Sequence, residues 1–556
     1  MIISPTERQV YKIVNDREKL IEFHEAHKND IWIGYNNRQY DQYIHKGIIC
    51  GFDPKKINDH IIVEKKPAWT FSRQLSQIHM INYDCMTSFH GLKTLEGFMG
   101  NDIRETSVPF DIDRKLTNQE IEEVLKYCQH DVEQTVEVWL QNQSDFNAQL
   151  ALIKLYELPL SAMGKTKARL APMILNASPV KLEDEWEIRV PETLELSKYK
   201  YIADWFLNPV NHSDDKSLEI DVCGVPHVFA WGGVHGAITK YNHICSPDEL
   251  LIMADVDQLY PTIMLEYGLL SRAIPPDGVE KFKDILATSL RLKAEGRKSE
   301  RAPYKLICNI VYGAEGDKTN DMFDPLHRKL VCVFGQLLML MLLEMLEDRV
   351  PSFELVQSNT DGILIKIKQD DFDLVDDVVY EWEQKTRLHM SFDQYKAIYQ
   401  GDVNNYVAVE WNGKVKSKGA YVKSLNPLDY DLPIVNKAIL KRLTEGVPPE
   451  KTINECDDLI EYQKIVKVSN KYFCGYHNGQ DLTDKTFRVF ASTDPLDSYI
   501  GKKKNKDACA EKFANTPIHC FIMNESVKGV KVDARLDKQY YIDLAYKRLR
   551  EKFGVW

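Results

Sequence analysis

Two aspartates at the ends of apolar runs are the residues best suited to chemistry. Asp255 lies next to the end of the run "LLIMADV", and Asp361 lies between the extended runs of "VQSNTDGILIKI". The second pattern predicts a hairpin with an acid at its turn, and the Tyr260-Pro261 pair predicts a turn after the first strand. An isolated aspartate in a tight turn is most often only a turn former. The two acids therefore need a further observation before they indicate a site.

A basic segment between the two acids supplies that observation. "SLRLKAEGRKSERAPYK" is expected to form an Arg/Lys-rich helix, after which Lys305, Asn309 and Tyr312 are spaced to share one helical face. Phosphoryl transfer needs carboxylates that hold two divalent ions and cations that neutralise a triphosphate. The order acid, basic helix, acid predicts that the two aspartates supply the first, and that Arg291 and Lys305 supply the second.

The overall composition is that of an ordinary globular protein. The 556 residues are 44% hydrophobic and 28% charged, and the chain is long enough for about three or four folding units. The net charge of −12 does not favour nucleic-acid binding, but basic clusters at 289–305, 414–423 and 501–506 are candidate phosphate-binding surfaces. Each cluster alone could equally be a solvated face.

The sequence predicts no membrane partner and a cytoplasmic location. The longest apolar run, "LVCVFGQLLMLMLLEML", is interrupted by Gln336 and Glu344 and is expected to form a buried helix. The N-terminus has no signal-peptide pattern. Eleven cysteines without a C-x-x-C pair argue against a zinc ribbon and a disulfide framework.

Three segments carry a family resemblance. "DVDQLYP", "KLICNIVYG" and "SNTDG" resemble, in this order, motifs A, B and C of family B DNA polymerases, and their spelling is most similar to bacteriophage and prophage members. "WGGVHGAI" resembles the Gly-Gly motif that tracks the template, and "KVKSKGAY" resembles the Lys-rich motif that holds the primer terminus. The resemblance covers nearly the whole chain. It implies a template-directed DNA polymerase that adds deoxynucleotides to a primer 3′ end, in phage replication within the cytoplasm of a bacterial host.

The resemblance also implies roles for individual residues. Two Mg²⁺ ions, for which Mn²⁺ could substitute, would be bound by Asp255, Asp361 and the backbone carbonyl of Val256. Tyr260 would lie under the sugar and exclude a 2′-hydroxyl. The triphosphate and base-pair pocket would be formed by Arg291, Lys305, Leu259, Asn309 and Tyr312, and DNA would be held by Gly232, Gly233, Lys416, Lys418 and Tyr421. At motif C the family usually has Asp-Thr-Asp-Ser, where this chain has Asn359 and Gly362 in place of the first acid and the serine; Gln258 and Ile310 replace serines of motifs A and B. These departures affect details of nucleotide selection, and the reaction should survive them.

The fold class expected from the resemblance is a mixed α/β multidomain protein. It would be a right-hand polymerase with palm, fingers and thumb behind a ribonuclease-H-like exonuclease domain. The expected domains are 1–140 (exonuclease-like), 141–185 (helical connector), 186–272 and 313–425 (palm), 273–312 (fingers) and 426–556 (thumb). Within the first domain, Thr117 and Glu120 form a capping box that predicts a helix start.

The exonuclease motifs are incomplete. "GYNNRQYDQYI" and "YCQHD" resemble the second and third motifs, which assigns Asn36, Tyr40, Asp41, Tyr127 and Asp131 to this site. The first motif, Asp-x-Glu on an upstream strand, is absent, because Asp16-Arg17-Glu18 is interpreted as a helix start. The chain is expected to begin one strand too late for proofreading, so 3′→5′ exonuclease activity should be weak or absent.

The predicted partners are primer-template DNA and deoxynucleoside triphosphates, with a monomeric enzyme assisted by replisome proteins such as primase, helicase or single-strand-binding protein. The intervals between Asp255 and Lys305 and between Gly313 and Asp361 leave no room for the insertions of protein-primed members of the family, so the expected primer is ordinary RNA or DNA. Two alternatives remain open. One is a reverse transcriptase or primase-like polymerase, and the other is a non-catalytic DNA-binding replisome component descended from a polymerase.

Overall fold

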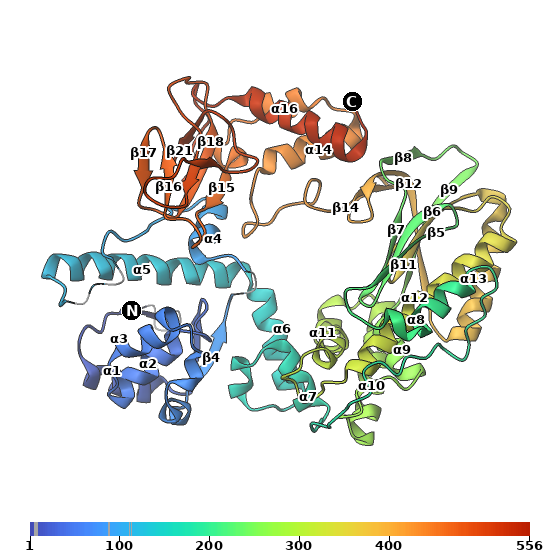
Figure 1. Ribbon diagram of the computed structural model, residues 1–556, viewed down its shortest axis with the longest axis horizontal. Coiled ribbons are helices and arrows are strands. Elements are labelled where there is room, and N and C mark those ends of the chain that lie inside the picture. Colours follow the sequence, from blue (N-terminus) through green and yellow to red (C-terminus); the bar gives the residue numbers. More distant parts are fainter. Residues whose placement is uncertain (5–8, 87–88, 110–111, 113) are drawn as a thin grey trace. The chain divides into compact units, whose positions relative to one another are not determined.

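The computed structural model describes residues 1–4, 9–86, 89–109, 112 and 114–556, and the chain divides into two compact units (Figure 1). Unit 1 comprises Met1–Lys165, Leu425–Val435 and Glu450–Leu544, and unit 2 comprises Thr166–Ser424, Asn436–Pro449 and Ala545–Trp556. Both units mix helices with strands, so the chain is a mixed α/β multidomain protein. The finer domain boundaries expected from the sequence stay predictions.

Unit 2 is built on a 10-stranded sheet in the order β14-β13-β12-β9-β11-β10-β7-β6-β5, with β8 paired to β12. Every strand pair in this sheet is antiparallel. The strands are β5 (Ser217–Val222), β6 (Val225–Ala230), β7 (Gly233–Ala237), β8 (Tyr241–Ile244), β9 (Glu249–Val256), β10 (Glu354–Ser358), β11 (Gly362–Lys368), β12 (Met390–Asp402), β13 (Asn405–Glu410) and β14 (Val415–Lys418).

Strand β9 lies inside this sheet, between β11 and β12. Its residues Leu251, Ile252, Met253 and Ala254 are all at most 4% exposed, which explains why the sequence is apolar on both faces of the strand. Leu251 and Met253 pack with Leu364, Tyr395 and others in one core cluster. A strand fixed in this way holds the residues at its end in a defined position.

The helices of unit 2 follow the pattern expected from the sequence in most respects. They are α7 (Leu170–Ile174), α8 (Lys200–Leu207), α9 (Leu259–Glu266), α10 (Pro276–Ala294), α11 (Lys298–Glu315), α12 (Pro325–Arg349) and α13 (Phe372–Thr386). The apolar run is helix α12, which packs on β7, α9 and α13 and is buried along most of its length. Among the described helices, α12 alone is long and apolar enough to cross a membrane, and 83% of its most apolar window is buried inside the structure. The prediction of a buried helix is confirmed.

Two local predictions were wrong. Tyr260-Pro261 does not form a turn, because helix α9 begins at Leu259 and a proline is tolerated in a first helical turn. The chain changes direction at Gln258, the residue just before helix α9, whose φ is 54°. The basic segment 289–305 is not one helix, because α10 ends at Ala294 and α11 begins at Lys298, with Gly296 between them in a left-handed conformation.

Unit 1 combines segments from both ends of the chain. Its N-terminal part contains the antiparallel pair β1 (Ile2–Ser4) and β2 (Gln9–Tyr11), the parallel pair β3 (Ile31–Gly34) and β4 (Ile81–Asp84), and helices α1 (Arg17–His27), α2 (Asp41–Cys50), α3 (Pro54–Asn58), α4 (Leu92–Phe98), α5 (Asn118–Gln141) and α6 (Gln143–Leu155). The predicted capping box begins α5. Asp16 caps α1 by accepting a hydrogen bond from the Lys19 amide at 2.9 Å, which confirms the interpretation of Asp16-Arg17-Glu18 as a helix start. The ribonuclease-H-like arrangement stays a prediction.

The C-terminal part of unit 1 is mostly β-structure. It has a three-stranded sheet in the order β15-β18-β21 and a four-stranded sheet in the order β17-β16-β19-β20. The strands are β15 (Lys464–Lys467), β16 (Cys474–His477), β17 (Gln480–Leu482), β18 (Thr486–Ala491), β19 (Gly501–Lys503), β20 (Glu511–Lys512) and β21 (Cys520–Ile522). Helices α14 (Pro433–Glu445), α15 (Pro449–Glu455) and α16 (Lys538–Arg548) each contain a boundary between the two units.

A buried arginine joins the two parts of unit 1. Arg488 on β18 is 0% exposed. Its guanidinium donates to the carbonyl oxygens of Gly97 at 3.2 Å and Asn101 at 2.7 Å, in the N-terminal part. It also donates to the carbonyl oxygens of Met523 at 3.2 Å and Glu525 at 2.6 Å, and to Gln463 Oε1 at 3.0 Å, in the C-terminal part. Burial lowers the pKa of Arg488 to about 10, so the side chain remains charged at neutral pH.

Candidate active site

The structure brings the two predicted aspartates together at the ends of neighbouring strands. Across the β9–β11 pair, Asp255 is opposite Gly362, and the Val256 amide donates to the Asp361 carbonyl at 2.7 Å. The hairpin expected around Asp361 is present, with β10 antiparallel to β11. A Cβ at Gly362 would lie 2.1 Å from Asp255 Oδ1, so the Asp255 carboxylate occupies the space that a side chain at 362 would need. This explains the glycine that departs from the family pattern at motif C.

The Asp255 carboxylate lies among other charges. Burial raises its pKa, the cation of Lys416 opposes that rise, and the negative charges of Asp361 and Asp393 add to it. Lys416 Nζ lies 4.0 Å from Asp255 Oδ2 and 3.7 Å from Asp393 Oδ2. The ammonium of Lys293 lowers the pKa of Asp255 as well, but the net shift is upward. A site in which acids destabilise one another's charge in this way is suited to additional cations.

A second ion pair lies next to this site. Asp257, two residues after Asp255, is paired with Lys293 from α10 and accepts a hydrogen bond from the Ser391 hydroxyl at 2.7 Å. Ser391 is opposite Asp255 across the β9–β12 pair. The basic helix α10 is therefore attached to the strand end that carries Asp255. Sequence reasoning did not identify Lys293, Asp257 or Ser391 individually.

Two tyrosines from different motifs pack together beside a buried thiol. The ring centroids of Tyr260 on α9 and Tyr312 on α11 lie 4.4 Å apart. The Tyr260 hydroxyl lies 3.3 Å from Sγ of Cys332, on α12. Burial raises the pKa of both phenols well above their usual range. Both tyrosines therefore stay neutral and form one wall of aromatic rings.

The remaining predicted nucleotide-binding residues differ in their availability. Lys305 and Asn309 are exposed on α11, and Lys305 has no ion-pair partner among the residues that the structure describes. Arg291 is also exposed, but it forms an ion pair with Glu295 at 3.0 Å. Leu259 is 4% exposed and belongs to the core. Lys305 is thus the most available cation of the predicted set.

The Gly-Gly pair lies against the motif C turn. Gly232 precedes β7 and Gly233 begins it. Gly233 has a φ of 146°, and a Cβ there would be 2.7 Å from Thr360 Oγ1. The backbone conformation and the close approach both require glycine at this position.

The predicted primer-binding residues are divided between two places. Lys416 lies at the acids, as described above, which is a contact that sequence reasoning missed. Lys418 ends β14 and is exposed. The Tyr421 ring has the Arg548 guanidinium 4.9 Å and the Lys552 ammonium 5.7 Å from its centroid. Tyr421 therefore belongs to a basic and aromatic cluster of unit 2.

In unit 1, the predicted exonuclease residues gather around three acids. Asp41 is the first residue of α2, and burial raises its pKa, to which the charges of Asp84 and Asp131 contribute. Tyr127 and Asp131 lie on one face of α5, as predicted, and the Tyr127 hydroxyl bonds to the Asp131 carboxylate. Asp84 was missed, although it ends an apolar strand in the same way as Asp255.

The outlying exonuclease residues make local contacts. The Tyr40 hydroxyl donates to Asn58 Oδ1 at 2.8 Å, and the exposed Asn36 donates its amide to Asp84 Oδ1 at 2.9 Å. A lysine lies at one of the three acids: Lys93 is paired with Asp131, lies 3.0 Å from Glu96 Oε1, and has its ammonium 4.5 Å from the Tyr127 ring centroid. Among the described residues, no group of three or more His, Cys, Asp or Glu is arranged as a ready metal site.

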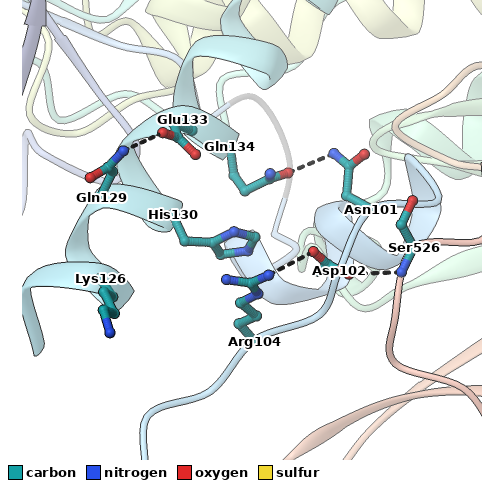
Figure 2. A pocket seen from close by; sticks show the side chains of 9 residues that line it. All are labelled: Asn101, Asp102, Arg104, Lys126, Gln129, His130, Glu133, Gln134 and Ser526. Atoms are coloured by element: carbon teal, nitrogen blue, oxygen red, sulfur yellow. Dashed lines mark hydrogen bonds and ion pairs between the residues drawn. The ribbon is translucent and has the colours of Figure 1, made fainter. Parts of the chain in front are cut away.

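Unit 1 also contains a polar cavity of about 400 Å³ between α5 and the segment after α4 (Figure 2). Figure 2 shows the His130 imidazole beside Arg104, whose guanidinium pairs with Asp102 at 3.0 Å. On the opposite side, Asn101 donates to Gln134 at 2.6 Å. Nε2 of His130 makes no hydrogen bond among the described residues, but it lies 3.4 Å from Glu96 Oε2. Because the other groups named here are partnered within the wall, the cavity does not by itself indicate a ligand.

Sequence comparisons and structure comparisons give different results for this chain. No protein-family model matches the sequence, and no curated protein matches it significantly. The chain is similar to a family B DNA polymerase from the hyperthermophilic archaeon Pyrobaculum calidifontis, with a TM-score of 0.43 and 14% sequence identity, over 99% of this chain and 74% of that one.

Proposed function

We propose that this chain is a template-directed DNA polymerase that extends a primer 3′ end by two-metal phosphoryl transfer. The observation that supports the proposal most directly is the meeting of Asp255 and Asp361 at the ends of β9 and β11. Two acids from distant segments lie beside a wall of two tyrosines, and α11 carries an exposed lysine. This is the combination of parts that nucleotidyl transfer requires.

The donor set fits magnesium. Asp255, Asp361 and the Val256 carbonyl offer only oxygen atoms, which are the ligands that Mg²⁺ prefers, and Mg²⁺ commonly uses one or two carboxylates together with substrate phosphates. A dedicated cage of three or more protein side chains is therefore not needed. When bound, two magnesium ions would activate the attacking 3′ oxygen and stabilise the leaving pyrophosphate.

The other residues of the site would bind and orient the substrates. Lys305 would neutralise the triphosphate, and Arg291 could join it after leaving its exposed pair with Glu295, which is a weak interaction. Tyr260 would lie under the sugar. Tyr312 and Asn309 would line the pocket of the nascent base pair. Gly232, Gly233, Lys416, Lys418 and Tyr421 would contact the primer-template.

A primer-extension assay tests this function. The purified chain, with Mg²⁺ and a labelled primer on a DNA template, should extend the primer with dNTPs in template order. Equal or better extension on an RNA template would favour the reverse-transcriptase alternative. DNA binding without any extension would favour the non-catalytic alternative, in which a polymerase fold serves only as a replisome component.

Family B membership, a phage-type origin and a role in phage replication within a bacterial cytoplasm are part of the same proposal. The motif spelling supports them. The substrates would be primer-template DNA and dNTPs, and replisome proteins would supply processivity to a monomeric enzyme. Extension by the chain alone should give short product ladders, and long unaided synthesis with strand displacement would contradict this expectation.

We expect little or no 3′→5′ exonuclease activity. The acids Asp41, Asp84 and Asp131 are gathered, but Lys93 neutralises Asp131 and Glu96. A 5′-labelled single strand incubated with Mg²⁺ should therefore remain uncut under conditions in which a primer is extended. Asp131→Asn provides the control, because any residual cleavage that it removes would come from this site. Rapid shortening of the single strand by the unaltered protein would show that the site is functional.

A further inference from the structure

A buried thiol lies at the hydroxyl ends of the two tyrosines. Cys332 lies near the middle of α12 and is 0% exposed. It belongs to none of the motifs described above. Its Sγ lies 3.3 Å from the Tyr260 hydroxyl, and the Tyr312 hydroxyl is a second hydrogen-bonding partner of the same thiol. One side chain therefore joins the hydroxyl ends of two aromatic rings that come from α9 and α11.

The backbone of α12 at Cys332 is anchored by a neighbouring side chain. Gln336, one helical turn further along α12, donates to the Cys332 carbonyl at 3.1 Å and to the Ala230 carbonyl at 2.9 Å, which links this part of α12 to β6. A Cβ at Gly335 would lie 3.5 Å from the Tyr260 ring, an ordinary van der Waals distance, so this part of α12 lies directly against the ring. The Tyr260 ring is thus fixed at its Cα by α9 and at its hydroxyl by α12.

We propose that Cys332 is a positioning residue that holds the Tyr260 ring in place and thereby sets the discrimination between deoxynucleotides and ribonucleotides. This inference rests on the proposed function. A ring that excludes a 2′-hydroxyl does so only if it cannot move away by the fraction of an ångström that the extra oxygen needs. With its hydroxyl end released, Tyr260 could tilt toward the space left by the thiol. The ribose would then fit more easily, while the deoxyribose would be affected little.

The experiment compares kcat/KM for one dNTP and for the matching NTP on the same primer-template. Cys332→Ala should raise the relative use of the ribonucleotide by roughly fivefold, the factor expected for loss of one modest hydrogen bond. The kcat/KM for the deoxynucleotide should change by less than about twofold, since the acids and cations of the site are unaltered. Cys332→Ser retains a hydrogen-bonding group and should restore most of the discrimination.

Two further variants separate positioning from general packing. Cys308→Ala removes another fully buried thiol, on α11, that forms no hydrogen bond with Tyr260 among the described residues, and it should leave the ratio unchanged. Tyr260→Phe removes the other half of the contact, so its effect should not add to that of Cys332→Ala in the double variant. This pair also covers the case in which Cys332→Ala fails to fold, because Tyr260→Phe then carries the test alone.

The outcomes are distinguishable. Normal dNTP extension with an unchanged ratio in both Cys332→Ala and Tyr260→Phe would overturn the role of Cys332 and leave the polymerase proposal intact. Additive effects in the double variant, or an equal change in Cys308→Ala, would also overturn it, since they indicate packing. No dNTP extension by the unaltered protein would overturn the polymerase proposal itself.

Discussion

We expect Asp361→Asn to lower the rate of primer extension by at least about 1,000-fold. Asn is almost the same size as Asp but carries no charge, so it cannot replace a carboxylate that binds magnesium. Stabilisation by a bound metal is worth several kcal/mol in a transition state, and each 1.36 kcal/mol is a factor of ten. Asp361 lies in the turn after β10 and is exposed, so the fold does not depend on its charge. The rate should be measured by single-turnover extension with saturating Mg²⁺ and dNTP.

The matched control is Asp376→Asn. Asp376 is exposed on α13 and has no ion-pair partner among the residues that the structure describes. The Asp376→Asn variant should therefore extend the primer at the unaltered rate. Circular dichroism and the melting temperature should be unchanged in both variants. Extension by Asp361→Asn at a normal rate would refute the assignment of the site.

The second large effect concerns stability. Arg488→Met should lower the free energy of unfolding of unit 1 by about 4 kcal/mol, because it leaves buried acceptors without a donor, and each such group costs about 1–3 kcal/mol. The acceptors include the carbonyl oxygens of Gly97, Asn101 and Glu525. For a unit of this size, the thermal transition should fall by about 10 °C. Scanning calorimetry of the unaltered protein and of the variant measures this shift.

Arg73→Met serves as the control for this prediction. Arg73 is exposed in unit 1 and should tolerate the same change within about 0.5 kcal/mol. Arg488→Lys should give an intermediate loss, since it keeps the charge but cannot reach all five acceptors. A transition that stays within about 1 °C of the unaltered protein in Arg488→Met would contradict the structural role of this arginine.

Local patterns in the sequence predicted most of the elements that position the site. The apolar run before Asp255, the hairpin around Asp361 and the buried helix α12 all follow from periodicity and turn chemistry, and all three are present. The two failures were also local. Pro261 was interpreted as a turn residue when it lies in a first helical turn, and a single glycine, Gly296, divides the basic segment into two helices.

The contacts between distant segments could not be predicted in the same way. The sequence of α12 does not distinguish Cys332 from its apolar neighbours. Its proposed role depends on its contact with Tyr260 of α9, which packs against Tyr312 of α11. The same holds for Lys416, which was assigned to the primer but lies at Asp255, and for Lys93 and Arg488. Sequence patterns predicted the strand ends and helix faces. The contact partners of each side chain depend on the tertiary fold, which brings distant segments together.

The composition of unit 1 has a consequence for how the protein is made. A ribosome delivers the N-terminus first, and domains generally begin to fold as they emerge. The first 165 residues, however, share their unit with Glu450–Leu544, so the whole of Thr166–Ser424 must be synthesised before their partners exist. The nascent N-terminal segment therefore has to wait, with the carbonyl groups that Arg488 will satisfy still in water. If translation stops before this arginine, the fragment contains every strand of the 10-stranded sheet of unit 2. It lacks part of the C-terminal segment that its N-terminal residues need to complete unit 1.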